Sequence, residues 1–98
     1  MNFYDFLWSS VRKPKLIVEY ARQVGVDAEI DENADFYERL RQVAILSVKI
    51  LRAEMSQLDV EIPQAEERCR EVVRFVLEAL QDLKEAGKDV EGIEAPRC

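Results

Sequence analysis

The chain has 98 residues, of which 48% are hydrophobic and 35% charged, and its formal net charge is −6. This length suits one small domain, and the composition is typical of a folded, acidic helical protein rather than a disordered chain. No apolar run reaches the roughly 18 to 20 residues that span a bilayer, and the first residues lack a secretory-signal pattern, so we expect no transmembrane segment and a cytoplasmic location.

Two short helices are expected at the N-terminus. Residues 2–12 repeat apolar side chains at a helical spacing, which indicates a helix with one buried face. Pro14 disfavours helical geometry in the residue before it and suits the first position of a second helix. That helix should end at Gly25, because glycine tolerates the positive φ of a helix C-terminus. Residues 26–32 then form a short acidic connection.

A third, long helix follows this connection. Asp31 and Asn33 are candidate N-caps, since their side chains can accept hydrogen bonds from the first free amide groups of a helix. Apolar residues keep a helical period to about residue 58. Glu54 falls within the apolar arc of this helix, and we expect its carboxylate to reach water or a basic partner, because an unpaired buried carboxylate is costly.

The fourth helix is expected from Pro63 to Gly87, after a turn at residues 59–62. Two long helices joined by so short a turn should pack antiparallel as a hairpin. The predicted fold is all-α: a small helical bundle built on a long antiparallel helical hairpin, with two short N-terminal helices covering its open side. Residues 1–87 should form this single domain, and residues 88–98 a polar, frayed C-terminal tail.

The third helix carries more apolar side chains than one buried face needs, since seven of the nine residues 43–51 are apolar. Leu46 points more than about 100° away from the main apolar face of the helix. Phe75 is the equivalent outlier on the fourth helix and falls level with Leu46. These side chains predict a patch on the outer face of the hairpin, through which the chain forms a homodimer or docks another helical protein. The alternative is that the short N-terminal helices cover this side and bury the patch within the chain. The hairpin residues assigned to this protein interface are Ile45, Leu46, Ala53, Phe75 and Ala79.

The first helix offers a second candidate interface. Four of the eight aromatic residues of the chain fall within its first eight positions. Aromatic side chains on a short amphipathic helix most often pack against the helix's own bundle. The alternatives are that these aromatic residues contact a partner protein, a membrane surface or single-stranded nucleic acid. Tyr4 and Trp8 are included in the predicted protein interface.

The alternative function is that of a small accessory subunit in a nucleoprotein assembly containing DNA or RNA. An acidic chain repels phosphate backbones, so such binding requires a local basic patch. Residues 1–30 balance their charges, whereas residues 59–98 carry six basic and eleven acidic side chains. The residues assigned to possible phosphate contacts are Arg12, Lys13, Lys15, Arg22, Arg39 and Arg41.

The two cysteines, Cys69 and Cys98, lack the spacing of a metal or redox motif. Cys69 falls on the apolar face of the fourth helix and is expected to be buried as a small apolar residue. Cys98 ends the polar tail and is expected to be an accessible thiol. An intrachain disulfide is the less supported alternative, because a reducing compartment disfavours it.

Residue types that build common active sites are missing. The chain has no histidine, which removes the usual general base near neutral pH and the imidazole ligands of most zinc sites. It also has no glycine-rich phosphate loop. We therefore expect a non-enzymatic protein–protein interaction and assembly module with no cofactor and no metal site. The acidic residues considered for magnesium, and interpreted as a solvated helix face, are Glu66, Glu67, Glu71, Glu78 and Asp82.

Overall fold

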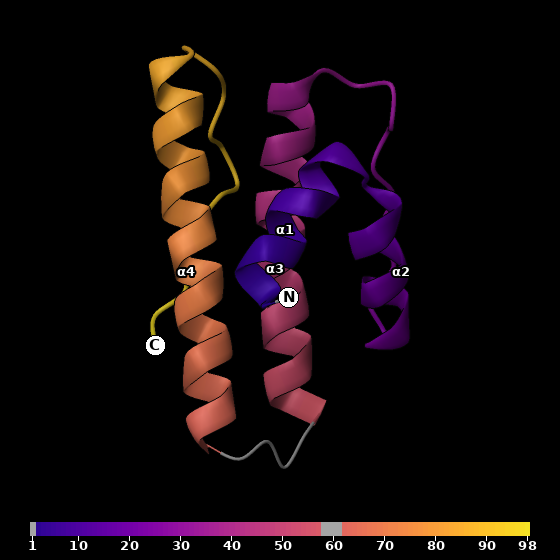
Figure 1. Ribbon diagram of the computed structural model, residues 1–98, viewed down its shortest axis with the longest axis vertical. Helices are drawn as coiled ribbons and strands as arrows, with labels where there is room; N and C mark the ends of the chain where they lie inside the picture. The colour runs from indigo at the N-terminus through magenta and orange to yellow at the C-terminus, as the bar shows by residue number, and fades with distance from the viewer. Residues whose placement is uncertain (1, 58–61) are drawn as a thin grey trace.

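A computed structural model describes residues 2–57 and 62–98 of the chain and contains four helices within them (Figure 1). No strand occurs in these ranges, which confirms the predicted all-α class. None of the helices described there is long and apolar enough to cross a membrane. The turn expected at residues 59–62 falls almost entirely outside the described residues. The helices are α1 (Phe3–Arg12), α2 (Lys15–Gln23), α3 (Phe36–Gln57) and α4 (Ile62–Glu85).

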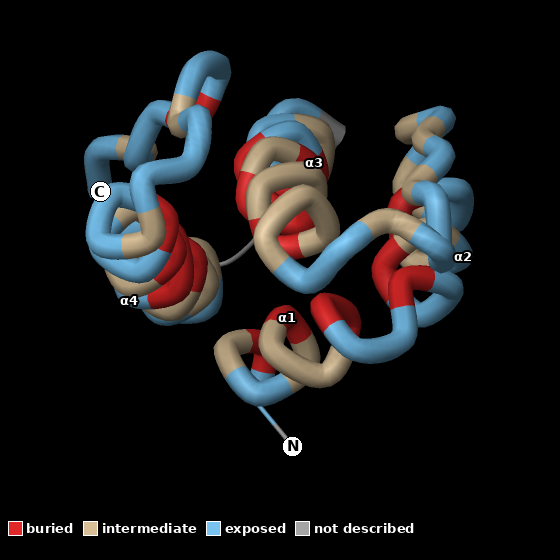
Figure 2. The backbone as a smooth tube through the Cα atoms, turned by 90° about the horizontal axis from the view of Figure 1, so that it is seen from above, coloured by how far each residue is buried: buried red, intermediate tan, exposed pale blue. Residues whose placement is uncertain are grey.

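The arrangement places α3 and α4 side by side and running in opposite directions (Figure 1). Seen from above, α1 lies on one face of this pair, α2 lies beside α3, and the C-terminal segment covers the opposite face (Figure 2). The buried side chains gather between α1, α3 and α4, where Leu7, Leu40 and Val76 are fully enclosed. Apolar faces of three helices thus meet in one core, which is the main source of stability in a bundle of this size.

The N-terminal helices begin and end largely as the sequence predicts. The side chain of Asn2 accepts a hydrogen bond from the Asp5 amide at 2.8 Å, which caps α1. Pro14 immediately precedes α2, and Gly25 follows it with a φ of 85°. The positive φ at Gly25 confirms the predicted C-terminal stop, since residues with a Cβ rarely adopt it.

The start of α3 corrects one prediction. Its N-cap is Asp35, whose Oδ1 accepts a hydrogen bond from the Glu38 amide at 2.9 Å. The predicted caps Asp31 and Asn33 lie in the preceding turn, where Asp31 Oδ1 accepts from the Asn33 amide at 2.9 Å. Three cap-forming residues occur within five positions, and only Asp35 directly precedes the helix. The spacing of Asp35 and Glu38 was the available signal, since Asp followed three residues later by Glu is typical of a helix start.

The C-terminal segment, residues 88–98, differs from the expected frayed tail. It descends beside α4, passes behind it and ends near the lower half of that helix (Figure 1). Ile93 within it is only 8% exposed, and its last residue, Cys98, forms a disulfide with Cys69. The prediction of a free Cys98 thiol is therefore wrong, whereas the buried position predicted for Cys69 is confirmed.

Candidate interaction surfaces

The apolar patch predicted on the outer face of the hairpin is not exposed. Phe75 and Ala79 are fully buried, and Leu46 is 4% exposed. Phe75 is buried because α1 covers it: the ring of Trp8 meets the Phe75 ring edge-on with centroids 4.9 Å apart. These three side chains belong to the core of one chain, and the predicted interface is wrong for them.

Leu46 does not face the same neighbours as Phe75. It borders a depression of about 260 Å³ between α3 and the connection that follows α2. The connection alternates half-buried and exposed residues, with Ala28 and Ile30 turned toward the bundle. Sequence periodicity placed Leu46 away from the main apolar face of α3, but the predicted single patch with Phe75 is wrong, because an irregular segment lies beside Leu46 and α1 lies against Phe75.

The other predicted interface residues, Tyr4, Trp8, Ile45 and Ala53, are half-buried. A Cβ placed on Gly92 would lie 3.5 Å from Ile45 Cδ1, so Ile45 meets the C-terminal segment. The carbonyl of Ala53 accepts a hydrogen bond from Ser56 Oγ at 3.0 Å. Of the predicted interface, Tyr4 and Trp8 on α1 remain as partly exposed aromatic side chains.

Tyr4 fixes one edge of α1 to α4. Its hydroxyl donates to the carboxylate of Glu78, and the guanidinium of Arg74 lies 4.0 Å from the centre of its ring. Arg74 Nε is also 3.4 Å from Glu78 Oε1. The hydrogen bond to Glu78, together with burial, raises the pKa of the Tyr4 phenol. This contact shows that the side of α4 carrying Glu78 adjoins α1.

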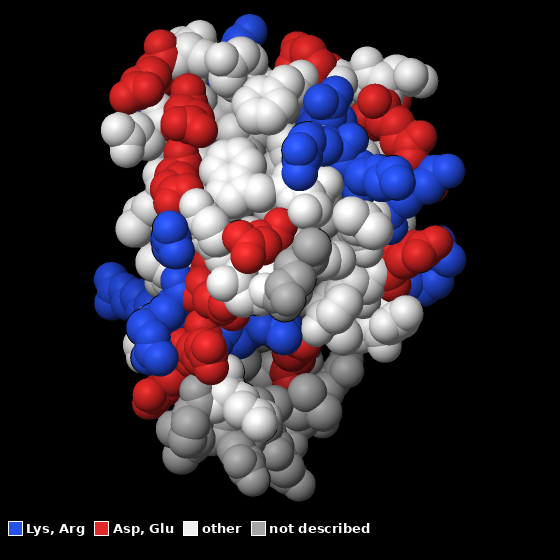
Figure 3. Space-filling model, viewed as in Figure 1, with Lys and Arg blue, Asp and Glu red and all other residues white. Residues whose placement is uncertain are grey.

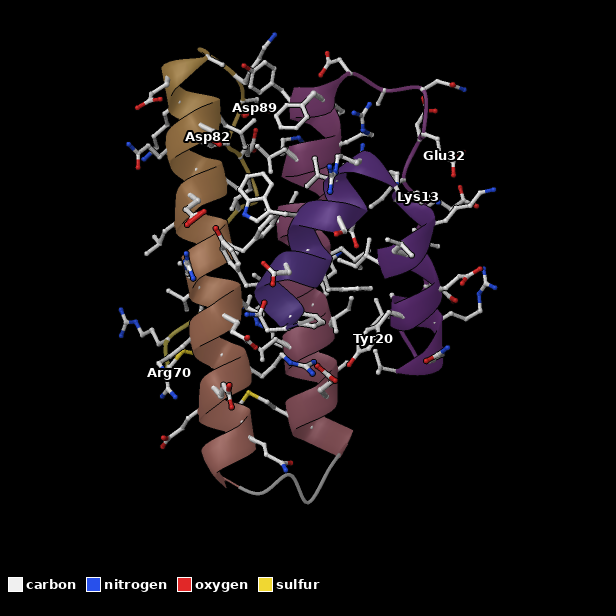
Figure 4. The ribbon with its side chains drawn as sticks, viewed as in Figure 1. Lys13, Tyr20, Glu32, Arg70, Asp82 and Asp89 are labelled. Atoms are coloured by element: carbon white, nitrogen blue, oxygen red, sulfur yellow. A yellow bond between two sulfur atoms is a disulfide. The ribbon has the colours of Figure 1, made fainter. Side chains whose placement is uncertain are left out.

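A polar cluster near the N-terminal end of α1 joins all four helices. Tyr20 donates to Glu54 Oε2 at 2.6 Å, and Arg68 Nη1 donates to Glu54 Oε1 at 2.7 Å and to the Tyr20 oxygen at 3.0 Å. The Arg68 guanidinium also lies 4.0 Å from the centre of the Phe3 ring. Figure 4 shows Tyr20 reaching from α2 toward α3. The basic partner expected for Glu54 is thus confirmed as Arg68.

The electrostatics of this cluster indicate a structural role. The Glu54 side chain is 13% exposed, and burial, followed by the hydrogen bond to Glu54, raises the pKa of Tyr20. No buried side-chain nitrogen or oxygen among the described residues lacks a hydrogen-bond partner. The three groups therefore satisfy one another, which is how a bundle tolerates polar atoms close to its core.

Two of the predicted phosphate-binding residues are committed to contacts within the chain. Arg39 Nε donates to the Val11 carbonyl at 2.8 Å and a second nitrogen donates to the Ala34 carbonyl, which ties the start of α3 to the end of α1. Arg41 binds both oxygens of Glu38 at 3.0 Å. These guanidinium groups stabilise the fold, so they are poor candidates for binding phosphate.

The remaining basic residues lie around α2. Lys15 Nζ is 4.0 Å from Glu32 Oε1, and Arg22 borders a groove of about 540 Å³ that is also lined by Glu29 and Glu32. Arg12 and Lys13 are exposed at the bend between α1 and α2. The bend between α1 and α2 therefore carries two exposed basic side chains that lie next to each other in sequence.

Charge is distributed unevenly over the face that carries α1. Figure 3 shows an acidic row over α4, a basic group over the bend between α1 and α2, and a band of mostly uncharged residues between them, with an acidic group near the centre of the face. Asp82 and Glu85 follow Glu78 at helical spacing, so they share the side of α4 that adjoins α1. Figure 4 places Asp82 and Lys13 on opposite sides of this face.

The uncharged band includes aromatic side chains. Trp8 is half-buried on α1, and Phe36, the first residue of α3, is 41% exposed. Phe36 lies one turn before Arg39, whose contact with Val11 holds that end of α3 against α1. We call the combined surface the α1 face: its band contains Trp8 and Phe36, its basic side Arg12 and Lys13, and its acidic side Asp82 and Glu85.

The acidic row does not assemble a cation site among residues 2–57 and 62–98, because no three Asp, Glu or Cys side chains there converge as metal ligands would. Comparisons with protein families, with curated proteins and with solved structures find nothing that matches this chain.

Proposed function

We propose that this chain is a non-enzymatic interaction module that forms a homodimer through the α1 face, with the α3–α4 pair as its scaffold. The observation that carries the proposal is the separation of charge on that face. Asp82 lies on one side of the mostly uncharged band and Lys13 on the other (Figure 4), with Glu85 about one turn after Asp82 and Arg12 next to Lys13. A surface arranged in this way complements a second copy of itself.

The symmetry of the contact follows from the charge pattern. In a homodimer with two-fold symmetry, each copy presents the same surface to the other. A two-fold axis parallel to the long direction of the bundle exchanges the two sides of the face, so the acidic side of one copy meets the basic side of the other. An axis across the bundle would place like charges together, which disfavours that alternative. The aromatic band then supplies the apolar centre and the charges fix the orientation.

The size of the face is sufficient for such a contact. The molecule measures 39 × 24 × 23 Å, and the α1 face spans the two longer directions. A stable interface buries about 800 Å² per partner. Most of this face would be covered, so Trp8 and Phe36 near its upper part should lose the solvent that now reaches them.

Charge-reversal variants test the proposal. Light scattering of the wild-type chain should give the mass of a dimer, and Lys13→Glu and Asp82→Lys should each shift it toward the monomer. The double variant carrying both changes should recover the dimer, because it restores opposite charges across the two-fold axis. Lys49→Glu, an exposed change on another side of α3, is the matched control. A wild-type chain that remains monomeric at about 0.5 mM would contradict self-association.

A second candidate function, an accessory role in a nucleoprotein assembly, is favoured by the exposed position of Arg12 and Lys13 at the bend. Replacing both with Gln should abolish binding to a short RNA or DNA probe measured at low salt, and added salt should weaken binding by the wild type. Asp82→Lys separates the two functions, since it disrupts the dimer without removing a phosphate contact. Absence of binding at low salt would eliminate this candidate.

A further inference from the structure

The C-terminal segment packs against the bundle through every third residue. Ile93 is buried, Val90 and Pro96 are half-buried, and the residues between them are exposed. The Ile93 amide donates to the Val90 carbonyl at 3.2 Å, which closes a turn. Gly92 occupies that turn with a φ of 87°, the positive value that the third position of a type II turn requires. The exposed acidic residues of the segment are Asp89, Glu91 and Glu94.

The surface beneath this segment comprises three residues of α3 spaced four apart and one residue of α4. Lys88 Nζ lies 5.5 Å from the centre of the Tyr37 ring, and Arg41 Nη1 donates to the Glu91 carbonyl at 3.3 Å. After the dominant hydrogen bond to Glu38, the charges of Asp89 and Glu91 help to raise the pKa of Arg41. We call this surface the tail-binding strip: Tyr37, Arg41, Ile45 and Cys69.

The disulfide is the strongest attachment of the segment to the strip. Eleven residues, 88–98, are held in place while only Ile93 among them is buried, and ordering each residue costs conformational entropy. The Cys69–Cys98 bond closes a chain separation of 29 residues and keeps the segment close to the strip. Without that bond, the contacts of Ile93 and its neighbours have to offset the whole ordering cost.

We propose that the tail-binding strip is a docking surface for an acidic peptide segment with apolar residues at every third position, and that the chain's own C-terminal segment blocks it until the Cys69–Cys98 disulfide is reduced. The occupant seen in the structure defines the chemistry of the partner. Its apolar side chains Val90 and Ile93 pack into the core, its Gly92 lies against Ile45, and the charges of Asp89 and Glu91 act on Arg41. A partner segment with the same pattern makes the same contacts.

Reduction supplies the release step. Cys98 is exposed and Cys69 is buried, so a thiolate of a dithiol reductant attacks the sulfur of Cys98 and displaces Cys69 as a thiolate, which takes up a proton. The second thiol of the reductant then attacks the mixed disulfide. The products are two protein thiols and the oxidised reductant. In a reducing compartment the strip is available to a partner, and in an oxidising one it is closed.

Fluorescence anisotropy with a labelled peptide of residues 88–98 carrying Cys98→Ser tests the docking surface. Oxidised wild-type chain should not bind this peptide, and full-length Cys98→Ser should bind it in competition with its own segment. Adding Ile93→Asp to the protein weakens the resident segment, so this double variant should bind the peptide at least about tenfold more tightly than Cys98→Ser alone. Circular dichroism checks that each protein keeps its helices.

Control peptides test whether binding requires the apolar and the acidic residues of the segment. A peptide with Ile93→Asp should fail to bind the double variant, and one with Asp89→Lys and Glu91→Lys should bind it at least about tenfold more weakly, because these two carboxylates act on Arg41. Amide exchange at Ile93 should be at least about tenfold faster in full-length Cys98→Ser than in the oxidised wild type. The proposal would be overturned if the oxidised wild type and the folded double variant bound the peptide equally well. It would also be overturned if neither bound it at about 1 mM. Equal binding of the lysine-substituted peptide would overturn the assignment of an acidic partner.

Discussion

The indole of Trp8 meets the ring of Phe75 edge-on, with the two centroids 4.9 Å apart. This contact seats α1 across α4 and seals Phe75 completely. Edge-to-face aromatic pairs contribute roughly 0.5–1.5 kcal/mol beyond the burial of their surface. The residue that the sequence marks as an outlier from the apolar face of the fourth helix is therefore one of the best-enclosed side chains among the described residues.

Phe75→Ala should accordingly destabilise the fold rather than alter an interface. We expect the free energy of unfolding to fall by about 3–5 kcal/mol, because the change removes a buried ring and leaves a cavity. Urea denaturation followed by circular dichroism measures this change. Leu77→Ala on the same helix is the matched control, since Leu77 is 53% exposed, and its effect should stay within about 0.5 kcal/mol. Similar values for both variants would show that Phe75 is not part of the core.

Hydrophobic periodicity predicted the helices because each helix has to turn its apolar side chains toward a core, whatever its neighbours are. It did not predict which neighbour covers which face. Ile45 and Leu46 carry a real excess of apolar surface on α3, yet Gly92 of the C-terminal segment meets Ile45 and the connection after α2 lies beside Leu46. Both covering segments are irregular and mostly polar in sequence, so the helical period of apolar residues did not reveal them.

Arg68 should matter more than any other cation on α4. Arg68→Met leaves the Glu54 carboxylate, 13% exposed, without its cationic partner. We expect a loss of roughly 2 kcal/mol in the free energy of unfolding, a typical value for a hydrogen bond to a charged group. Combining it with Glu54→Gln should recover part of that loss, because no unpaired charge remains.

Arg70→Met provides the control for this cluster. Arg70 is 3.9 Å from Glu66, and its side chain is 65% exposed, so its loss should cost no more than about 0.5 kcal/mol. Thermal denaturation of the four proteins compares them directly. If the double variant proves less stable than Arg68→Met, the cluster does not depend on pairing the Glu54 charge.

The capping residue of α3 gives a prediction that distinguishes Asp35 from Asn33. Asp35→Ala removes the acceptor of the Glu38 amide and should lower the free energy of unfolding by about 1 kcal/mol. Asn33→Ala should have an effect within about 0.5 kcal/mol, because Asn33 takes part in the preceding turn only through its backbone amide. Chemical denaturation tests both. A larger loss of stability from Asn33→Ala than from Asp35→Ala would indicate that Asn33, one of the N-caps predicted from the sequence, caps α3.

Glu38 makes stability depend on acidic pH. Hydrogen bonds from Arg41, and then from Gln42, lower the pKa of Glu38 below its ordinary value of 4.5. A lowered pKa means that the unfolded chain takes up the proton first as pH falls. The contribution of Glu38 is therefore complete above about pH 4.5 and is lost as pH falls through the folded-state pKa.

Glu38→Gln should consequently narrow the difference in thermal midpoint between pH 7 and pH 3 relative to the wild type, since the glutamine does not titrate. Glu66→Gln is the control, because Glu66 is 57% exposed and lies 3.9 Å from its partner Arg70. If Glu66→Gln and Glu38→Gln narrow the difference in thermal midpoint equally, the contact between Glu38 and Arg41 is not a source of the pH dependence of stability.

The disulfide should stabilise the whole bundle as well as the segment that it attaches. Cys69 and Cys98 are 29 residues apart in sequence, and a cross-link over a loop of this size typically contributes 2–4 kcal/mol, about 3 kcal/mol or slightly more here, by restricting the unfolded chain. Cys98→Ser should lower the free energy of unfolding by that amount, whereas Ile93→Ala with the disulfide intact should cost about 2 kcal/mol through lost burial. Added dithiol reductant should bring the wild type to the stability of Cys98→Ser and leave that variant unchanged. If reductant does not change the unfolding midpoint of the wild type, the disulfide contributes nothing to the stability of the fold.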